Sequence, residues 1–142
     1  MIVYKKLGKT VLVTLLLTLT FLALAACGKK SEVLILELDD NPASGFEWEI
    51  YQADPIFKEE RSYKEKPNKA EGGTTTFTLT PEEPGFTNVV FRQKMKKGEE
   101  VALQYSYSII IDENYAIEVV SSEGKLGEGN LTSDKIPEPV IR

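Results

Sequence analysis

The chain has 142 residues, with 22 acidic and 17 basic side chains and a formal charge of −5. An acidic protein is a poor partner for nucleic acid, whose phosphates require a basic surface. The chain contains one cysteine and no histidine, which excludes an internal disulfide, Ser-His and Cys-His nucleophilic catalysis and the commonest zinc ligands. We therefore expect a protein that is not an enzyme and that holds no metal and no cofactor.

The first 26 residues have the features of a bacterial lipoprotein signal. Three lysines come first, then an apolar run, then a small-residue cleavage motif that ends in cysteine: Lys5, Lys6 and Lys9, residues 11–24, and Leu24-Ala25-Ala26-Cys27. An uncleaved transmembrane helix would need about 20 consecutive apolar residues, and threonines interrupt this run. We expect cleavage before Cys27, a lipid on its sulfur, and a protein anchored on the extracytoplasmic face of a bacterial cell membrane.

Removal of the signal leaves residues 27–142, the length of one ordinary domain. Three lysines leave with the signal and all acidic residues remain, so the formal charge becomes −8. Residues 28–31 separate Cys27 from the first expected strand, a reach of at most about 14 Å. We predict a short tether over residues 27–31, a β-sandwich over 32–121, a flexible tail over 122–142, and a monomer.

Short apolar segments, divided by Pro, Gly, Asn and Asp turns, predict an all-β sandwich. The expected strands cover residues 32–38, 46–52, 74–80, 86–93, 100–111 and 115–121, with a weaker strand near Tyr63. In the longest of them, alternate residues from Val101 to Ile111 are apolar, which predicts one buried face. The sequence after Gly124 is rich in Gly, Ser and Pro and is expected to be poorly ordered.

A turn at residues 41–45 divides the first two strands. Pro42 fixes its own φ and drives Asn41 toward extended backbone. Gly45 is free to adopt a positive φ, and the hydroxyl of Ser44 is placed to close the bend. The following strand alternates apolar and acidic residues from Phe46 onward. These features predict a rigid loop anchored by aromatic residues.

The eight residues Asn41-Pro42-Ala43-Ser44-Gly45-Phe46-Glu47-Trp48 resemble the N-P-T-T-G-Y-x-W loop of the chagasin family. Members of this family are small immunoglobulin-like inhibitors of papain-like cysteine proteases. Glu71-Gly72-Gly73-Thr74 resembles the family's second loop, G-x-G-G-T, and Pro84-Gly85 resembles the turn that follows it. The resemblance runs over residues 33–111. It implies an immunoglobulin-like sandwich and reversible inhibition by three loops that bind the active-site cleft.

The resemblance also implies which residues contact the protease. They are Asn41, Pro42, Ala43, Ser44, Gly45 and Phe46 in the first loop, Gly72, Gly73 and Thr74 in the second, and Gln93, Lys94 and Met95 in the third. Ala43 and Ser44 would obstruct the catalytic cysteine, and residues 72–74 would clamp the rim of the cleft through their backbone. If successive strands alternate in direction, all three loops lie at the end of the domain that points away from the membrane.

The third loop departs from the family pattern. Where the family carries Arg-Pro-Trp, this chain reads Phe-Arg-Gln-Lys-Met-Lys-Lys-Gly over residues 91–98, without proline or tryptophan. This departure permits an alternative, a lipid-anchored immunoglobulin-like interaction or scaffold module without inhibitory activity. An inhibitor predicts that Ser44 and the backbone of Gly72 and Gly73 are exposed side by side, whereas a scaffold could bury or separate them.

Other chemistry suggested by the sequence is weaker. No lysine and no helix follow Gly72-Gly73, which argues against a phosphate cradle. Adjacent acids such as Asp39-Asp40 point to opposite faces of a strand and do not form a catalytic dyad. The lysines at 94, 96 and 97 either protect a strand edge or steer the domain toward an acidic partner.

Overall fold

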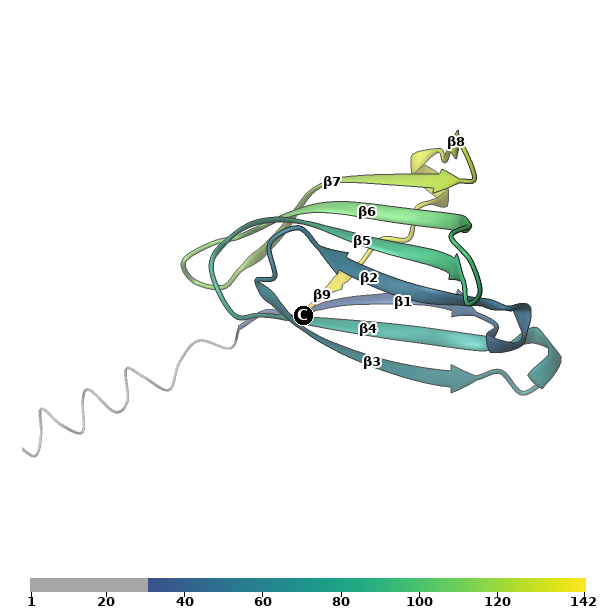
Figure 1. Ribbon diagram of the computed structural model, residues 1–142. Helices are drawn as coiled ribbons and strands as arrows, with labels where there is room; N and C mark the ends of the chain where they lie inside the picture. Colours follow the sequence, from purple (N-terminus) through teal and green to yellow (C-terminus); the bar gives the residue numbers. More distant parts are fainter. Residues whose placement is uncertain (1–30) are drawn as a thin grey trace, which may run out of the picture. The chain divides into compact units, whose positions relative to one another are not determined.

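The computed structural model describes residues 31–142, which fold into two antiparallel sheets packed face to face (Figure 1). One sheet has the strand order β3-β4-β1-β9 and the other has the order β2-β5-β6-β7-β8. The strands are β1 (Leu34–Asp40), β2 (Phe46–Gln52), β3 (Phe57–Glu65), β4 (Gly73–Pro81), β5 (Gly85–Met95), β6 (Val101–Ile111), β7 (Ile117–Leu126), β8 (Gly129–Asn130) and β9 (Val140–Ile141). Three 3-10 turns interrupt them: η1 (Pro42–Ser44), η2 (Lys69–Glu71) and η3 (Ser133–Lys135). The predicted all-β sandwich is confirmed.

The inner faces of the sheets are formed by alternate residues, as the period-two pattern requires. In β4 every second residue is buried, and in β6 burial alternates from Tyr105 to Ile111. Each fully buried Leu, Ile or Phe contributes roughly 1.5–3 kcal/mol relative to exposure. The core therefore draws on both sheets along most of their length.

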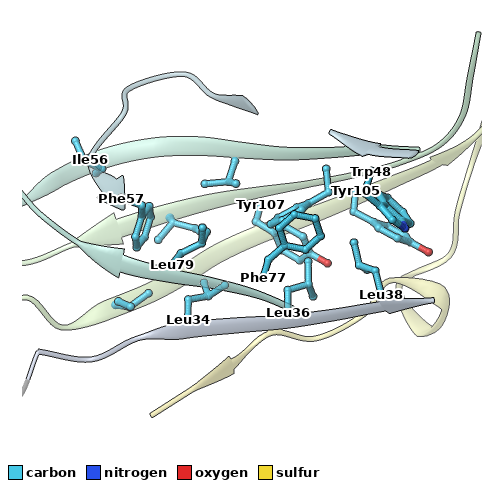
Figure 2. Close-up of a cluster of buried hydrophobic side chains, with 14 of the residues drawn as sticks. Leu34, Leu36, Leu38, Trp48, Ile56, Phe57, Phe77, Leu79, Tyr105 and Tyr107 are labelled. Carbon is cyan, nitrogen blue, oxygen red and sulfur yellow. The ribbon is translucent and has the colours of Figure 1, made fainter. Parts of the chain in front are cut away.

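Aromatic side chains form the centre of this core. Phe91 makes edge-to-face contacts with Phe77 of the opposite sheet, at a centroid distance of 5.0 Å, and with Tyr107, at 5.9 Å. Trp48 stacks on Tyr105 at 6.0 Å. Figure 2 shows Trp48 and Tyr105 at one end of the cluster and Ile56 and Phe57 at the other. The aromatic residues thus link β2 to the middle of the sandwich.

The weak strand expected near Tyr63 is confirmed as β3, an edge strand that pairs with β4 alone. Its sequence signal is weak because most of its side chains are exposed and charged, with ion pairs from Lys58 to Glu60 and from Arg61 to Glu59. Charged residues of this kind protect an open edge from pairing with other chains. Arg61 also donates to the carbonyl of Trp48 at 3.1 Å, which ties the edges of the two sheets together.

The C-terminal segment differs from the flexible tail predicted over residues 122–142. β7 continues to Leu126, and β9 pairs with the start of β1. Ile136 is buried in the core, and the hydroxyl of Tyr107 donates to the carbonyl of Pro137 at 2.7 Å. The composition suggests disorder, but two apolar side chains, Ile136 and the partly buried Leu131, and a few hydrogen bonds hold the segment where it crosses from one sheet to the other.

No helix within residues 31–142 is long and apolar enough to cross a membrane. The predicted signal over 1–26, lipidated Cys27 and all but the last residue of the tether lie outside the described residues.

Candidate functional site

Three connections between strands converge at one end of the sandwich (Figure 1). The first loop, residues 41–45, joins β1 to β2, the second, residues 66–72, joins β3 to β4, and the third, residues 96–100, joins β5 to β6. Strand register places the first loop between the other two, since Asp40 pairs with Gly73 and Phe46 pairs with Met95. The three loops therefore lie at one end of the sandwich, as predicted.

The first loop is a 3-10 turn closed by hydrogen bonds within itself. The side chain of Asn41 accepts from the amide of Ala43 at 3.1 Å, and the hydroxyl of Ser44 accepts from the amide of Phe46 at 3.3 Å. Gly45 ends the turn with φ of 85°, a left-handed conformation that favours glycine. No residue of this 3-10 turn is buried. The turn is ordered by local chemistry and presents its tip to solvent.

The second loop repeats this design. Asn68 accepts from the amide of Ala70 at 3.2 Å, a 3-10 turn follows, and Gly72 ends it with φ of 74°. The two loops share the pattern Asn-x-Ala-x-Gly, which is visible in the sequence at residues 41–45 and 68–72. Both loops therefore expose a short tip of the same construction, with Ala43 and Ala70 at matching positions.

Gly72 and Gly73 are buried, so the exposure of their backbone beside Ser44 that is expected of an inhibitor is not found, and this criterion by itself favours the scaffold alternative. A Cβ on Gly72 would collide with the carbonyl oxygen of Asp40 and would lie 2.9 Å from the Cα of Asn41. A Cβ on Gly73 would collide with the carbonyl of Lys64. Glycine is needed at 72 because the second loop lies directly against the backbone of the first, and at 73 because β4 lies directly against β3. The exposed part of the second loop is instead residues 67–71, and Thr74 is half-buried behind it.

The third loop holds the first from the opposite side. The backbone amide of Lys96 donates to the carbonyl of Gly45 at 2.9 Å, and its ammonium group donates to the carbonyl of Pro42, also at 2.9 Å. The whole tip, residues 96–100, is exposed. The sequence places Lys96 in a basic cluster at the third loop but does not predict its contact with the first loop, because a bond between residues 54 positions apart leaves no local signal.

The predicted third-loop residues Gln93, Lys94 and Met95 lie in β5, before the loop begins, and all three are half-buried. Met95 pairs with Phe46 at the start of β2. Met95 thus supports the base of the first and third loops and does not form an exposed tip.

A shallow hollow of about 250 Å³ opens between the first loop, Glu71 and Gln93. Asp39 and Asp40 are among its lining residues: Asp40 accepts a 2.6 Å hydrogen bond from the hydroxyl of Thr75, and the exposed carboxylate of Asp39 pairs with Lys66 at 3.4 Å. Among residues 31–142 there is no group of three or more acidic, His or Cys side chains placed to hold a metal ion.

Comparison with known proteins identifies the chain by sequence. A family model described as "Chagasin family peptidase inhibitor I42" matches residues 28–111. That range covers more than half of the chain and includes all three loops. No curated protein matches the chain.

Among solved structures, the chain is similar to a cysteine protease inhibitor from Entamoeba histolytica. The two share 23% identity, and the match covers 56% of this chain and 77% of the other, with a TM-score of 0.49. From the match of the family model, we conclude that this chain belongs to the chagasin family of peptidase inhibitors.

Proposed function

We propose that this protein is a reversible inhibitor of papain-like cysteine proteases, that its three clustered loops bind the active-site cleft, and that a lipid on Cys27 anchors it to a bacterial membrane. Family membership supports the inhibitory activity. The observation that carries the loop assignment is the packing of the first loop between the other two, by Gly72 on one side and Lys96 on the other.

The geometry favours binding because the exposed tip is ordered before a partner arrives. Association normally costs free energy for fixing loops and side chains, and a preformed loop reduces that cost. Here the first loop has hydrogen bonds within itself and two bonds to Lys96. Residues 42–44 would enter the cleft near the catalytic cysteine and block access of substrate without undergoing chemistry.

The exposed tips on either side would contact the two rims of the cleft. The second loop would use residues 67–71, in place of the buried Gly72 and Gly73. The third loop would use residues 96–100, a short charged tip where the family carries tryptophan. The loss of that aromatic contact would weaken binding at one rim of the cleft and would reduce the number of proteases that the protein binds.

The proposed anchor agrees with the direction of β1. Ser31 precedes β1, and the strand runs from Leu34 toward the first loop over seven residues, about 20 Å at roughly 3.3 Å per residue. The loop cluster therefore lies at the opposite end of the sandwich from the point where the tether joins it. An inhibitor anchored in this way would present its loops outward.

Two matched alanines test the loop assignment. Ala43 and Ala53 are both exposed and both lie in turns, but at opposite ends of the sandwich. The full chain, purified in a mild non-ionic detergent, is assayed against papain and a panel of related proteases. We expect Ala43→Trp to weaken inhibition about a hundredfold by blocking entry of the first loop, while Ala53→Trp inhibits like the unmodified protein. Ala70→Trp reports the second loop in the same way.

Equal inhibition by the Ala43→Trp and unmodified proteins would contradict the loop assignment. Absence of inhibition by a folded, unmodified protein would contradict the inhibitor proposal and favour the scaffold alternative. The anchor is tested separately by labelling cells with a radioactive fatty acid. Cys27→Ser should abolish incorporation, and incorporation that persists in this variant would contradict lipidation at Cys27.

A further inference from the structure

A fourth connection lies at the loop end of the sandwich, outside the range matched by the family model. The turn between β7 and β8, residues 126–129, reads Leu-Gly-Glu-Gly. Leu126 pairs with Leu103, and the amide of Gly127 donates to the carbonyl of Ala102 at 2.9 Å. Ala102 is two residues beyond the end of the third loop. Figure 1 shows the end of β7 and β8 on the same side as the connection between β5 and β6.

The position of this turn suits contact with the same partner. In the sheet order, β2, β5, β6 and β7 are successive neighbours, so the turn is displaced sideways from the first loop by about 14 Å, or three spacings of roughly 4.8 Å. A standard protein interface covers about 800 Å² on each partner, which is wide enough to include both. The turn and the three loops can therefore belong to one continuous binding surface.

The turn is also set back from the tips. Its register with Ala102 and Leu103 places it about two residues, or roughly 7 Å, behind the base of the third loop at residue 100, and farther behind the tip of that hairpin. This set-back turn would meet the rim of the cleft that the third loop also contacts, while the first loop enters the cleft itself.

Leu126 gives this turn an exposed apolar surface. Its side chain is 61% exposed, the largest exposed fraction among the large hydrophobic residues of the described chain. The backbone at this point is held by the pairing of β7 with β6 on one side and β8 on the other. An exposed leucine on a paired strand supplies apolar area with little further ordering on binding.

We propose that residues 126–129 form a fourth contact with the target protease, in which Leu126 packs against the cleft rim beside the third loop. This proposal rests on the proposed inhibitory function. The contact would replace, from a segment outside the family range, part of the apolar surface that the third loop lacks without tryptophan. It also gives the ordered C-terminal segment a role in binding.

The test compares Leu126→Asp with Val140→Asp. Val140 is another exposed apolar residue, 48% accessible, in the short edge strand β9, where it pairs with Ile35 near the start of β1. The full chain in mild detergent is assayed for the inhibition constant and dissociation rate with the most strongly inhibited protease of the panel. Leu126→Asp should weaken inhibition roughly tenfold, mainly through faster dissociation. Leu126→Met should inhibit almost as well as the unmodified protein, and Val140→Asp should have no effect on inhibition.

Thermal unfolding of all three variants checks that the sandwich is intact. If the unmodified protein inhibits and Leu126→Asp inhibits equally well, the fourth contact is overturned while the inhibitory function stands. If the unmodified protein inhibits no protease of the panel, both proposals are overturned. Loss of inhibition in Leu126→Met equal to that in Leu126→Asp would also overturn a packing contact, because methionine preserves the apolar surface.

Discussion

The two ends of the sandwich use their connections in different ways. At the end where β1 begins, turns return apolar residues to the core: Ile56 is buried between β2 and β3, and Ile117 is buried where β7 begins. At the loop end, the 3-10 turns η1 and η2 bury no residue, yet hydrogen bonds and close backbone contacts hold the loops together. One end is ordered by closing the core, and the other is ordered while its tips remain exposed. This difference favours binding at the loop end.

The largest expected effect comes from a substitution at the end of the sandwich where β1 begins and turns close the core. Ile56→Ala should lower the free energy of unfolding by about 2–4 kcal/mol, because it removes buried methyl groups and leaves a cavity. Under conditions where the variant is folded, its inhibition constant should be unchanged, since residue 56 is remote from the loops. Urea unfolding and a protease assay check both statements. A large change in inhibition with the fold intact would contradict the separation of the two ends.

At the loop end, Gly72→Ala should affect both stability and inhibition. The new Cβ would collide with the carbonyl of Asp40 at a backbone φ of 74°, so we expect a loss of about 2 kcal/mol in stability. Because the first loop must move to relieve the collision, inhibition should weaken as well. Unfolding in urea and the inhibition constant are measured on the same preparation.

Gly85→Ala is the matched control for Gly72→Ala. Gly85 also has a positive φ, 151°, but a Cβ there would meet only the tip of the Ile56 side chain, at 3.8 Å, and the residue begins β5 at the end of the sandwich opposite the loops. Its variant should show only the cost of backbone strain, on the order of 1 kcal/mol or more. Equal effects of the two substitutions on inhibition would contradict the view that Gly72 acts through its contact with the first loop.

Sequence reasoning succeeded where the determining chemistry is local. The alternation in β6 follows from side-chain period, and the bend at residues 41–45 follows from Asn41, Pro42 and Gly45, which lie within five residues of one another. It failed where the cause is a contact between distant residues. Gly72 was assigned to an exposed surface, but its burial depends on Asp40, 32 positions away. The ordering of the C-terminal segment likewise depends on where Ile136 and Pro137 meet the core, which composition does not reveal.

The free energy of unfolding should depend on alkaline pH through a residue of the packed core, Tyr107, and not through the loops. Burial raises the pKa of Tyr107 above its ordinary value of 10.0. Above pH 10 the unfolded state releases this proton and the folded state retains it, so the free energy of unfolding should fall as pH rises, by up to about 1.4 kcal/mol per pH unit for this group. Tyr107→Phe should reduce that slope. It should also cost about 1 kcal/mol at pH 7, through loss of the hydrogen bond to Pro137.

Urea unfolding at pH 7, 10 and 11 measures this dependence. Burial also raises the pKa of Tyr105, so some slope should remain in the variant. An identical pH dependence in Tyr107→Phe and the unmodified protein would show that Tyr107 is not responsible.

The smallest expected effect concerns Lys96, and it separates the two ways in which a lysine at this position could act. If the ammonium group fixes the first loop by its bond to Pro42, Lys96→Met should weaken inhibition roughly two- to fivefold, as expected for loss of one exposed hydrogen bond. Stability should change little, because the backbone bond from Lys96 to Gly45 remains.

Lys97→Met removes the same charge from the neighbouring residue and leaves the bond from Lys96 to Pro42 in place. If the two variants lose affinity equally, and added salt reduces the difference from the unmodified protein, the lysines act by attracting an acidic protease. A loss confined to Lys96→Met and insensitive to salt would instead identify an internal bond that keeps an exposed loop in its binding conformation.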